Sequence, residues 1–443
     1  MSSVLRAGPS RPPRILVVGA GPGGSVAAIA LRRELPDAEV TLVDKATFPR
    51  DKTCGDGMGP GARRILEQLG LTEVFERFGT PTGVAISGPG GVSAAIEKST
   101  IAHGDFRGYV VPRLDLDEAL KNAAVEAGVT FREGVSFQGI EMSDDAGGAV
   151  VRLARDGTGQ GGTTTPAVGH DPAAETGVTT EAYDLVVGAD GAYSAVRRAL
   201  GIARPAKKDT IIAMRAYATV THPERVLADT LWFDFIDELL PAYGWIFPLP
   251  GDRANVGIGI PVDLLAQREQ KLGELFDVYL ADLRRRGFEV TDVGSHATHQ
   301  LPHGARQAMT AGPYPVVLIG DAAATINTLS GEGIFYAMAA GVQLAEHLAA
   351  ARASGGDDAL RGTGVLQTVR SFERAFTRRF TRHHRTCGLG QRLMRSPRWA
   401  RFTIHSVGRD QSAMATVTSM MFDEGSVGIS HVLKAAVRGA LRA

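Results

Sequence analysis

The sequence has little cysteine and no surplus of charge of either sign. Its 443 residues include two cysteines, Cys54 and Cys387, which are too few for a disulfide framework and indicate a reduced, cytoplasmic protein. The 48 basic and 48 acidic residues cancel, so the charge balance gives no support for nucleic-acid binding. No apolar run approaches the ~20 residues of a membrane span, and residues 1–13 lack the apolar segment of a signal peptide.

The spacing that metal ligands need is also missing. There is no Cys-x-x-Cys pattern. His299 and His303 have the four-residue spacing of a zinc-binding helix, but Pro302 argues against a helix and no glutamate follows His299. The sequence therefore predicts no metal site.

A glycine-rich turn near the start is the most informative feature that the sequence does contain. Residues 15–18 form a short apolar run, as a buried parallel strand requires, and Gly19, Gly21 and Gly24 follow with G-x-G-x-x-G spacing. The first glycine permits a tight turn, the second lets the backbone approach a pyrophosphate, and the third lets a helix pack on the strand. Taken alone, the turn is also compatible with a connection that binds nothing.

The residues after the turn complete a dinucleotide-binding unit. Residues 25–35 are predicted to form a helix whose N-terminal amides face the phosphates, and residues 40–43 a second strand. Asp44 ends that strand, with Lys45 beside it, where a carboxylate can accept a hydrogen bond from a ribose hydroxyl. Together these features predict a dinucleotide site.

Two later strands also end in glycine and aspartate. A strand over residues 183–187 ends in Gly-Ala-Asp-Gly, which contains Asp190. A strand over residues 316–319 ends in Gly320 and Asp321. Both aspartates are therefore predicted to line the same cofactor.

Arg113 and a glycine-bracketed turn complete the set of cofactor residues. Arg113 lies between a short strand and a helix, and Gly331, Gly333 and Ile334 lead into another helix. Amides at a helix N-terminus favour negative charge, which suits a reduced, anionic flavin. A nicotinamide cofactor would need only the first unit, so the additional loops favour FAD.

These residues resemble the aromatic-hydroxylase group of FAD-dependent oxidoreductases and, within it, the geranylgeranyl reductase family. Residues 48–57 are similar to that family's D-K-x-C-G loop, residues 243–260 contain its Y-x-W-x-F-P signature, and residues 330–341 resemble its final FAD motif. The resemblance implies a bound FAD and the reduction of isolated double bonds in prenyl chains. Thr328 stands where the family usually has a proline, which leaves a specialised natural-product substrate open.

The expected fold class is α/β, with a Rossmann-like FAD-binding domain, an interleaved antiparallel-sheet substrate domain and C-terminal helices. The expected boundaries are residues 14–81, 108–204 and 311–351 for the FAD-binding domain, 82–107 and 205–310 for the substrate domain, and 352–443 for the helical region. Residues 156–181 have almost no large apolar residues and are predicted to form a long flexible loop within a hairpin.

Two residues of the loop over residues 48–57 are candidate catalytic groups. The resemblance places Cys54 near the flavin as a candidate proton donor, and the neighbouring Arg50 and Lys52 predict a partly activated thiol. Asp56 stands where many relatives have glycine and is the second candidate. The alternatives are a cysteine that only fills space and a solvated carboxylate.

Aromatic residues make up only 6% of the chain, yet six of them lie within residues 232–247. On alternating strands, Tyr243, Trp245 and Phe247 are predicted to form a wall for an apolar small-molecule substrate. Phe233 and Phe235 are interpreted as ordinary sheet core.

A basic amphipathic pattern marks the C-terminal region. Phe372, Phe376 and Phe380 recur at helical spacing, and arginines crowd the positions between and after them. Such a helix can lie on an anionic membrane, which would place the protein at the inner membrane face. The favoured interpretation is a helix packed through its phenylalanines, with solvated or ion-paired arginines.

Two reactions fit these residues. In the first, reduced FAD gives a hydride to a carbon–carbon double bond of an isoprenoid or similar apolar substrate, and Cys54, Asp56 or a flavin-bound water supplies the proton. In the second, the chain is a monooxygenase of secondary metabolism, which needs mainly oxygen and a dry pocket. A flavin-binding protein without catalysis is the third alternative.

The source of electrons is expected to be external. Gly88–Gly91 lacks the helix and acid of a second nucleotide unit, so no NADPH domain is recognised. NADPH or a reduced carrier is therefore expected to dock transiently.

Overall fold

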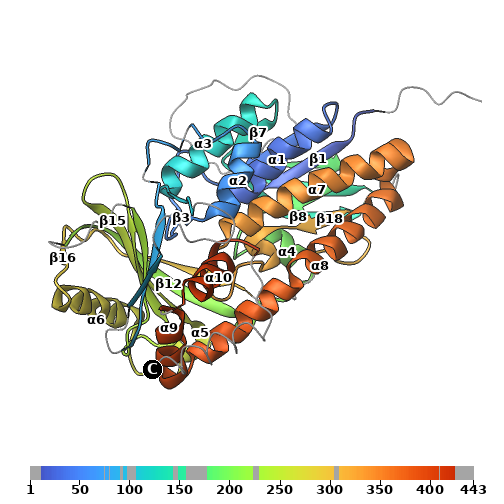
Figure 1. Ribbon diagram of the computed structural model, residues 1–443. Helices are drawn as coiled ribbons and strands as arrows, with labels where there is room; N and C mark the ends of the chain where they lie inside the picture. Colours follow the sequence, from blue (N-terminus) through green and yellow to red (C-terminus); the bar gives the residue numbers. More distant parts are fainter. Residues whose placement is uncertain are drawn as a thin grey trace, which may run out of the picture.

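The computed structural model of the chain describes residues 11–424 except 74, 79, 90–92, 97–105, 143–147, 156–176, 223–228, 304–308 and 409. In this part of the chain, a parallel sheet with helices lies beside a large, mainly antiparallel sheet, and C-terminal helices reach from one to the other (Figure 1). The predicted α/β fold class is confirmed.

Five parallel strands form the sheet that carries the glycine turn, in the order β18-β11-β1-β2-β7. The strands are β1 (Arg14–Val18), β2 (Glu39–Asp44), β7 (Thr130–Glu133), β11 (Leu185–Gly188) and β18 (Val316–Leu318). Strands β1, β11 and β18 are nearly continuous apolar runs because side chains on both faces of the sheet are covered.

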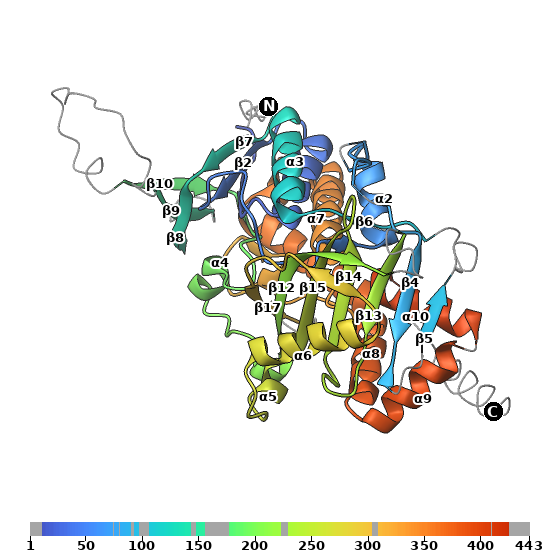
Figure 2. The ribbon, with the colours of Figure 1, turned by 90° about the vertical axis from the view of Figure 1, so that its left-hand side faces the viewer.

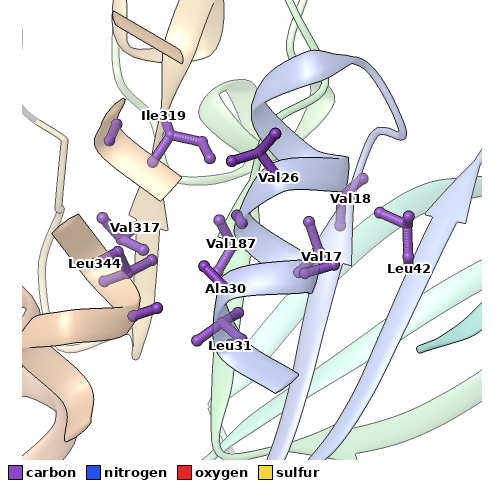
Figure 3. Packing of buried hydrophobic residues seen from close by; sticks show 14 of the residues in the cluster. Val17, Val18, Val26, Ala30, Leu31, Leu42, Val187, Val317, Ile319 and Leu344 are labelled. Carbon is purple, nitrogen blue, oxygen red and sulfur yellow. The ribbon is translucent and has the colours of Figure 1, made fainter. Parts of the chain in front are cut away.

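Helices α1 (Pro22–Glu34) and α7 (Ile334–Gly355) build the core beside this sheet. Val17 of β1, Val26 of α1 and Leu344 of α7 lie in one buried cluster (Figure 3). The two helices approach closely at Gly341, which has no side chain. A Cβ at this position would lie only 2.9 Å from the Cα of Ala27. The stretch Ile334–Leu360 is long and apolar enough to cross a membrane, but most of it is buried inside the fold.

Shorter elements surround the parallel sheet. They are the helices α2 (Pro60–Gln68), α3 (Arg113–Glu126) and α4 (Ala195–Ala199), the two-stranded sheet of β3 (Gly57–Met58) and β6 (Tyr109–Val110), and the three-stranded sheet of β8 (Val135–Met142), β9 (Ala149–Arg155) and β10 (Val178–Tyr183).

The hairpin around the predicted flexible loop differs from expectation. Strand β10 begins at Val178, which pairs with Ala154. The loop predicted over residues 156–181 therefore ends earlier than expected, because residues 178–181 belong to the strand. Tyr183 ends β10 and Leu185 begins β11, so the single strand predicted over residues 183–187 is two strands in different sheets. Residues 156–176 lie outside the described residues.

The large sheet has the strand order β16-β12-β15-β14-β13-β4-β5, and β17 also pairs with β12. Its strands are β4 (Gly83–Ser87), β5 (Ser93–Ile96), β12 (Thr210–Thr221), β13 (Thr230–Asp234), β14 (Tyr243–Pro248), β15 (Arg253–Pro261), β16 (Glu289–Thr291) and β17 (Ala297–Pro302). All pairs are antiparallel except β4 with β13. Chain segments from two regions of the sequence therefore meet in one sheet.

Helices cover both faces of the large sheet. Helix α6 (Leu272–Arg285) crosses one face (Figure 2). The helix predicted over residues 264–286 is interrupted, because α5 (Val262–Leu265) ends early and α6 starts anew where the Glu274 carboxylate accepts from the Lys271 amide.

The C-terminal helices cover the other face. They are α8 (Gly362–Met394), α9 (Pro397–Gly408) and α10 (Gln411–Phe422). Helix α8 runs past the parallel sheet, and α9 and α10 pack against the large sheet (Figure 1). Phe372, Phe376 and Phe380 of α8 are buried against the core, which confirms the interpretation of a packed helix.

Candidate functional site

A long cleft of ≈ 570 Å³ follows the ends of the parallel strands. Among the predicted cofactor residues, all except Gly24 line it, namely Gly19, Gly21, Asp44, Lys45, Arg113, Asp190, Gly320, Asp321, Gly331, Gly333 and Ile334. The carboxyl ends of parallel strands meet at one edge of a sheet, which explains why segments so distant in sequence converge here.

The three glycines of the turn differ in their surroundings. Gly19 has a φ of 102°, and a Cβ there would lie 2.5 Å from the Ala189 carbonyl oxygen. A Cβ at Gly24 would lie 1.8 Å from the carbonyl oxygen of Gly19, so Gly24 allows the helix to pack on the strand. At Gly21 the nearest atoms would be 3.6 Å away, and this glycine lines the cleft. Gly21 is therefore the position that leaves room for a ligand.

Asp44 ends β2 as predicted and is held in place by the backbone. Its two oxygens accept from the amides of Ala20 and Ala46, at 2.8 Å and 2.9 Å. Arg50 also donates to Oδ2 at 3.5 Å, so the second lone pair of Oδ1 is the one with which Asp44 can accept from a ligand hydroxyl in the cleft.

Asp190 and Asp321 both line the cleft, but their carboxylates have different partners. The Asp190 carboxylate accepts from the Ala195 amide at 2.6 Å and also from the Ser194 hydroxyl, so it already caps α4. Asp321 pairs with Lys52 at 3.1 Å. Burial alone would raise the pKa of Asp321, but the charge and hydrogen bond of Lys52, together with other nearby positive charge such as that of Arg113, outweigh it and the pKa is lowered.

Arg113 is buried and committed to an internal partner. Its guanidinium makes two 2.7 Å hydrogen bonds to Asp117, and Arg50 donates to the same carboxylate at 2.6 Å. Arg50 also lines the cleft, and no sequence pattern links it with Asp117. The pair of arginines places positive charge beside Gly21, where a pyrophosphate would lie.

A second, smaller cavity of ≈ 90 Å³ adjoins the long cleft, and we call it the aromatic cavity. Both are lined by Cys54, His299, Gly331, Gly333 and Ile334, which mark their junction. All three predicted substrate residues line the aromatic cavity, namely Tyr243, Trp245 and Phe247.

The walls of the aromatic cavity come from three parts of the chain. Phe233 lines it as well as being buried, whereas Phe235 only packs in the neighbouring core. Phe422 at the end of α10 closes one side. The Tyr243 hydroxyl donates to the Ser330 carbonyl, which links the sheet to the turn before α7.

Cys54 lies at the junction but is not activated as predicted. Burial raises the pKa of its thiol above the ordinary value, and this effect outweighs the lowering by Arg113 and Lys52. The side chain of Lys52 pairs with Asp321, and that of Arg50 with Asp117. The expectation of a partly activated thiol is therefore wrong, and Cys54 is a neutral thiol.

Asp56 is fully buried, so the solvated-carboxylate alternative is also wrong. The residue lines the aromatic cavity and adopts a left-handed φ of 65°. Its Oδ2 accepts from the Tyr217 hydroxyl at 2.7 Å and from the Asn255 amide at 2.8 Å, whereas Oδ1 is buried and has no hydrogen-bond partner in the described chain. Burial raises the pKa of Asp56 to about 6, although the bonds from Tyr217 and Asn255 favour the charged form. This carboxyl can therefore hold a proton near neutral pH.

Glu332 was overlooked although it stands between two predicted glycines. It is buried and lines the aromatic cavity, and its carboxylate accepts from the Phe335 amide at 3.0 Å. Burial raises the pKa of Glu332 to about 7 despite this bond. A glutamate among turn glycines ordinarily indicates a solvated loop. No sequence pattern therefore predicted that Glu332 is buried beside the aromatic cavity.

His299 lies on β17 and His303 directly follows this strand, so neither lies on a helix, as Pro302 indicated. Only His299 reaches the junction of the two cavities. Burial and the nearby charge of Lys52 lower the pKa of His299 to about 4, so its ring is neutral.

Comparison with known proteins shows which family this chain is similar to. The FAD binding domain family matches residues 13–363. A menaquinone reductase from Mycolicibacterium smegmatis is 33% identical over 343 residues, which cover 75% of each protein. A digeranylgeranylglycerophospholipid reductase from Methanopyrus kandleri is 28% identical over 337 residues, with 74% of this chain and 78% of the relative covered.

Solved structures show the same fold. A geranylgeranyl bacteriochlorophyll reductase-like protein from Thermoplasma acidophilum has a TM-score of 0.71 over 96% of each chain, with 20% sequence identity. At this identity the likeness concerns the fold alone.

Proposed function

This chain belongs to the FAD binding domain family and is an FAD-dependent oxidoreductase, and we propose that it reduces carbon–carbon double bonds of an isoprenoid or similar apolar substrate. The observation that carries the proposal is the junction at Cys54. There a cleft with the features of a dinucleotide site meets a small aromatic cavity that contains a buried, protonatable carboxyl. Relatives named as reductases of prenylated compounds support it.

The residues of the long cleft fit FAD. The cleft extends from Asp44 to the Gly331 turn, and Gly21 leaves room for a pyrophosphate beside Arg113. Asp44 would accept from the ribose, and the α7 amides near Ile334 would face the flavin ring. Asp321 would accept a hydrogen bond from the middle part of the cofactor, either while it keeps its ion pair with Lys52 or after that pair has opened.

Reduction of an alkene needs a hydride and a proton. Bound and reduced FAD supplies the hydride. An unactivated double bond has no electron sink, so a well-placed acid is needed on the protein side. Asp56 holds that proton on Oδ1, the oxygen that Tyr217 and Asn255 leave free. The aromatic wall orients the substrate and excludes water, and Cys54 is the second candidate donor.

The direct test is anaerobic turnover with the dithionite-reduced protein and a panel of prenylated quinones and prenyl diphosphates. We expect a product two hydrogens heavier per reduced bond, detected by mass spectrometry. In deuterium oxide, both added hydrogens should be deuterium, because dithionite supplies only electrons and the hydrogen on the flavin N5 comes from the solvent. A fully reduced flavin that leaves every member of the panel unchanged would contradict the proposal.

One observation favours a monooxygenase as the second candidate. The aromatic cavity is compact, at ≈ 90 Å³, and largely apolar, which suits oxygen chemistry on a small substrate as well as reduction of one end of a prenyl chain. Turnover under ¹⁸O₂ distinguishes the two reactions. Label in the product indicates the monooxygenase, and a saturated product without label indicates the reductase.

We propose that electrons arrive from NADPH or a reduced carrier that docks transiently. The described residues form one glycine-rich dinucleotide unit, and residues 90 and 91 of the Gly88–Gly91 segment lie outside them. Mixing the oxidised protein with NADPH, NADH or a reduced ferredoxin, and following flavin bleaching, identifies the donor.

We also propose that the protein is cytoplasmic and contacts the inner membrane face through α9. The phenylalanines of α8 are buried and cannot serve, but Trp399 and Phe402 of α9 are exposed beside Arg398 and Arg401. Aromatic and basic side chains together favour an anionic bilayer surface. The test is sedimentation with phosphatidylglycerol vesicles. Replacing Trp399 and Phe402 by serine should abolish binding, whereas Val125→Ser on α3 should not.

A further inference from the structure

A third cavity, of ≈ 410 Å³, opens beside β12, and we call it the outer cavity. Asp51, Leu114, Tyr217 and Arg253 are among its lining residues. The Leu114 and Arg253 side chains are exposed, so solvent reaches this space. The outer cavity and the aromatic cavity have no lining residue in common.

Tyr217 bridges the two cavities. Tyr217 lines the outer cavity, and its hydroxyl donates a 2.7 Å hydrogen bond to Oδ2 of Asp56, which lines the aromatic cavity. Tyr217 on β12 stands directly opposite Asn255 on β15, and both donate to the same Asp56 oxygen. The antiparallel register therefore fixes the contact.

We propose that Tyr217 is a proton relay that connects the outer cavity with Asp56 and reloads this carboxyl between turnovers. The inference rests on the proposed reduction, in which Asp56 gives its proton to a substrate carbon and becomes a carboxylate. Tyr217 then passes its hydroxyl proton to Oδ2 and takes a proton from a hydronium ion in the outer cavity. One proton moves inward and no electrons move. Rotation of the carboxyl returns the proton to Oδ1, the oxygen without a hydrogen-bond partner in the described chain.

The surroundings of Tyr217 suit a relay better than a proton store. Burial and the charge of Asp56 raise the pKa of the phenol above its usual range, so it passes protons without staying ionised. The Arg215 guanidinium lies 4.3 Å from the centre of the Tyr217 ring and pairs with Asp51 at 2.5 Å. Arg253 lies on the same ring at 5.8 Å. The positive charge of Arg215 opposes this rise in the pKa of Tyr217, so it stabilises the phenolate that exists briefly while the proton moves inward.

Asn255 cannot replace Tyr217 in this role. Its amide donates to Asp56 and to the Cys54 carbonyl, and its oxygen accepts from Trp245, so all its partners lie inside the protein. Arg113 and Cys54 also face the Asp56 region, but neither lines the outer cavity.

The first test follows hydrogen–deuterium exchange at the Asp56 carboxyl in the FAD-loaded protein. Its protonated C=O stretch, identified by its loss in Asp56→Asn, shifts when deuterium replaces hydrogen. In Tyr217→Phe we expect this exchange to slow by about tenfold or more. Exchange at the wild-type rate in Tyr217→Phe would overturn the relay. The measurement does not depend on substrate turnover.

The matched control is Tyr279→Phe. The Tyr279 hydroxyl also donates to an aspartate at 2.7 Å, to Oδ2 of Asp234, in the core on the α6 face of the same sheet and outside all three cavities. In Tyr279→Phe, hydrogen–deuterium exchange at the Asp56 carboxyl should proceed at the wild-type rate. If Tyr279→Phe slowed this exchange as much as Tyr217→Phe does, the slowing would be a general structural effect and not the loss of a relay.

A second variant leaves the Tyr217–Asp56 bond intact. Leu114→Trp fills part of the outer cavity from an exposed position. We expect slower exchange here too, and an unchanged rate would show that the proton does not come through this cavity.

The second test separates the relay from the reaction itself. With Asp56 already protonated, later turnovers of Tyr217→Phe should be slower than its own first turnover by about tenfold or more, whereas in wild type the two rates should be alike. In Asp56→Asn the first turnover should already be slow. Equal rates in first and later turnovers of Tyr217→Phe would overturn the relay. Absence of any saturated product from the wild type would instead overturn the proposed reduction, and the exchange experiment would still decide the relay.

Discussion

The indole Nε1 of Trp245 donates a 2.9 Å hydrogen bond to Oδ1 of Asn255. The Asn255 amide in turn donates to the Cys54 carbonyl and to Oδ2 of Asp56, both at 2.8 Å. One fully buried amide therefore joins the substrate wall to the loop that carries both candidate proton donors. Because the amide oxygen serves Trp245 and the nitrogen serves the loop, the orientation of this side chain is defined by its partners.

Replacing Asn255 by alanine should affect both stability and proton affinity. The Trp245 Nε1 group would lose its acceptor in a buried site, which costs about 1–3 kcal/mol of the free energy of unfolding. Loss of a bond that favours the charged carboxylate should also raise the pKa of Asp56 above about 6. Urea denaturation and an infrared titration of the carboxyl measure the two effects.

The control for this prediction is Asn122→Ala. Asn122 is exposed and donates to Glu118 on the surface of α3. It should change the free energy of unfolding by less than about 0.5 kcal/mol. Equal effects of the two variants would show that the buried amide has no special role.

The convergence of the predicted cofactor residues on one cleft was predictable because their signals are local. Gly19, Gly21 and Asp44 follow from one strand, one turn and one helix, and Asp321 from another strand end. Each of these residues is defined by a few neighbours in sequence, and parallel strands bring their ends together without further information.

The surroundings of Asp56 beside the aromatic cavity were not predictable in the same way. Asp56, Tyr217 and Asn255 meet only because β12 pairs with β15 in one register and the loop after Cys54 packs against both strands. Sequence periodicity indicates that a residue lies in a strand, but not which residue stands opposite it. The same limit explains why Asp56 resembled a solvated loop residue before its burial was known.

A comparison of Gly21 and Gly24 tests the assignment of the glycine turn. A Cβ at Gly21 meets nothing closer than 3.6 Å, so Gly21→Ala should leave the stability of the FAD-free protein unchanged. It should nevertheless weaken FAD binding by roughly tenfold or more, about 1.4 kcal/mol, because the methyl group occupies the space of the pyrophosphate. Thermal melting and FAD fluorescence titration measure these quantities.

Gly24→Ala should behave differently. Its Cβ would lie 1.8 Å from the Gly19 carbonyl oxygen, so both folding and FAD binding should be lost together. If Gly21→Ala retained normal FAD affinity, the cleft would not hold the pyrophosphate at this turn.

The raised pKa of Cys54 leads to a prediction about its reactivity. Since the thiolate is the nucleophile, labelling of Cys54 by iodoacetamide should be slow at neutral pH and should increase only above the ordinary thiol value of 9.0. The Cys54→Ala protein, which retains the buried Cys387, provides the blank. Rapid labelling near pH 7 would contradict the raised pKa and would show that the Cys54 thiol is activated.

Turnover of the same variant ranks the two candidate donors. Cys54→Ala should retain FAD and slow turnover by about tenfold or less, whereas Asp56→Asn should slow it by about 100-fold or more. The reverse order would make Cys54 the proton donor. Unchanged turnover in Cys54→Ala would leave this cysteine with a packing role.

Glu332 should make stability depend on pH. Its carboxyl has an ordinary pKa of 4.5 and a pKa of about 7 in the folded protein, because burial disfavours the charge. Between these values the folded protein holds a proton that the unfolded chain has lost. Stability should therefore fall as pH rises from about 4.5 to about 7 and level off above it, by up to about 3 kcal/mol.

Glu332→Gln isolates this contribution from those of other groups. The free energy of unfolding in urea, measured at several pH values for the FAD-loaded wild type and the variant, should show a gap that changes across the window from about pH 4.5 to about pH 7. The variant should gain on wild type toward the upper end, since glutamine avoids the buried charge. Glu126→Gln, at an exposed position on α3, serves as the control and should run parallel to wild type. A constant gap for Glu332→Gln would show that Glu332 titrates alike in the folded and unfolded chain, and that the turn before α7 keeps it accessible to water.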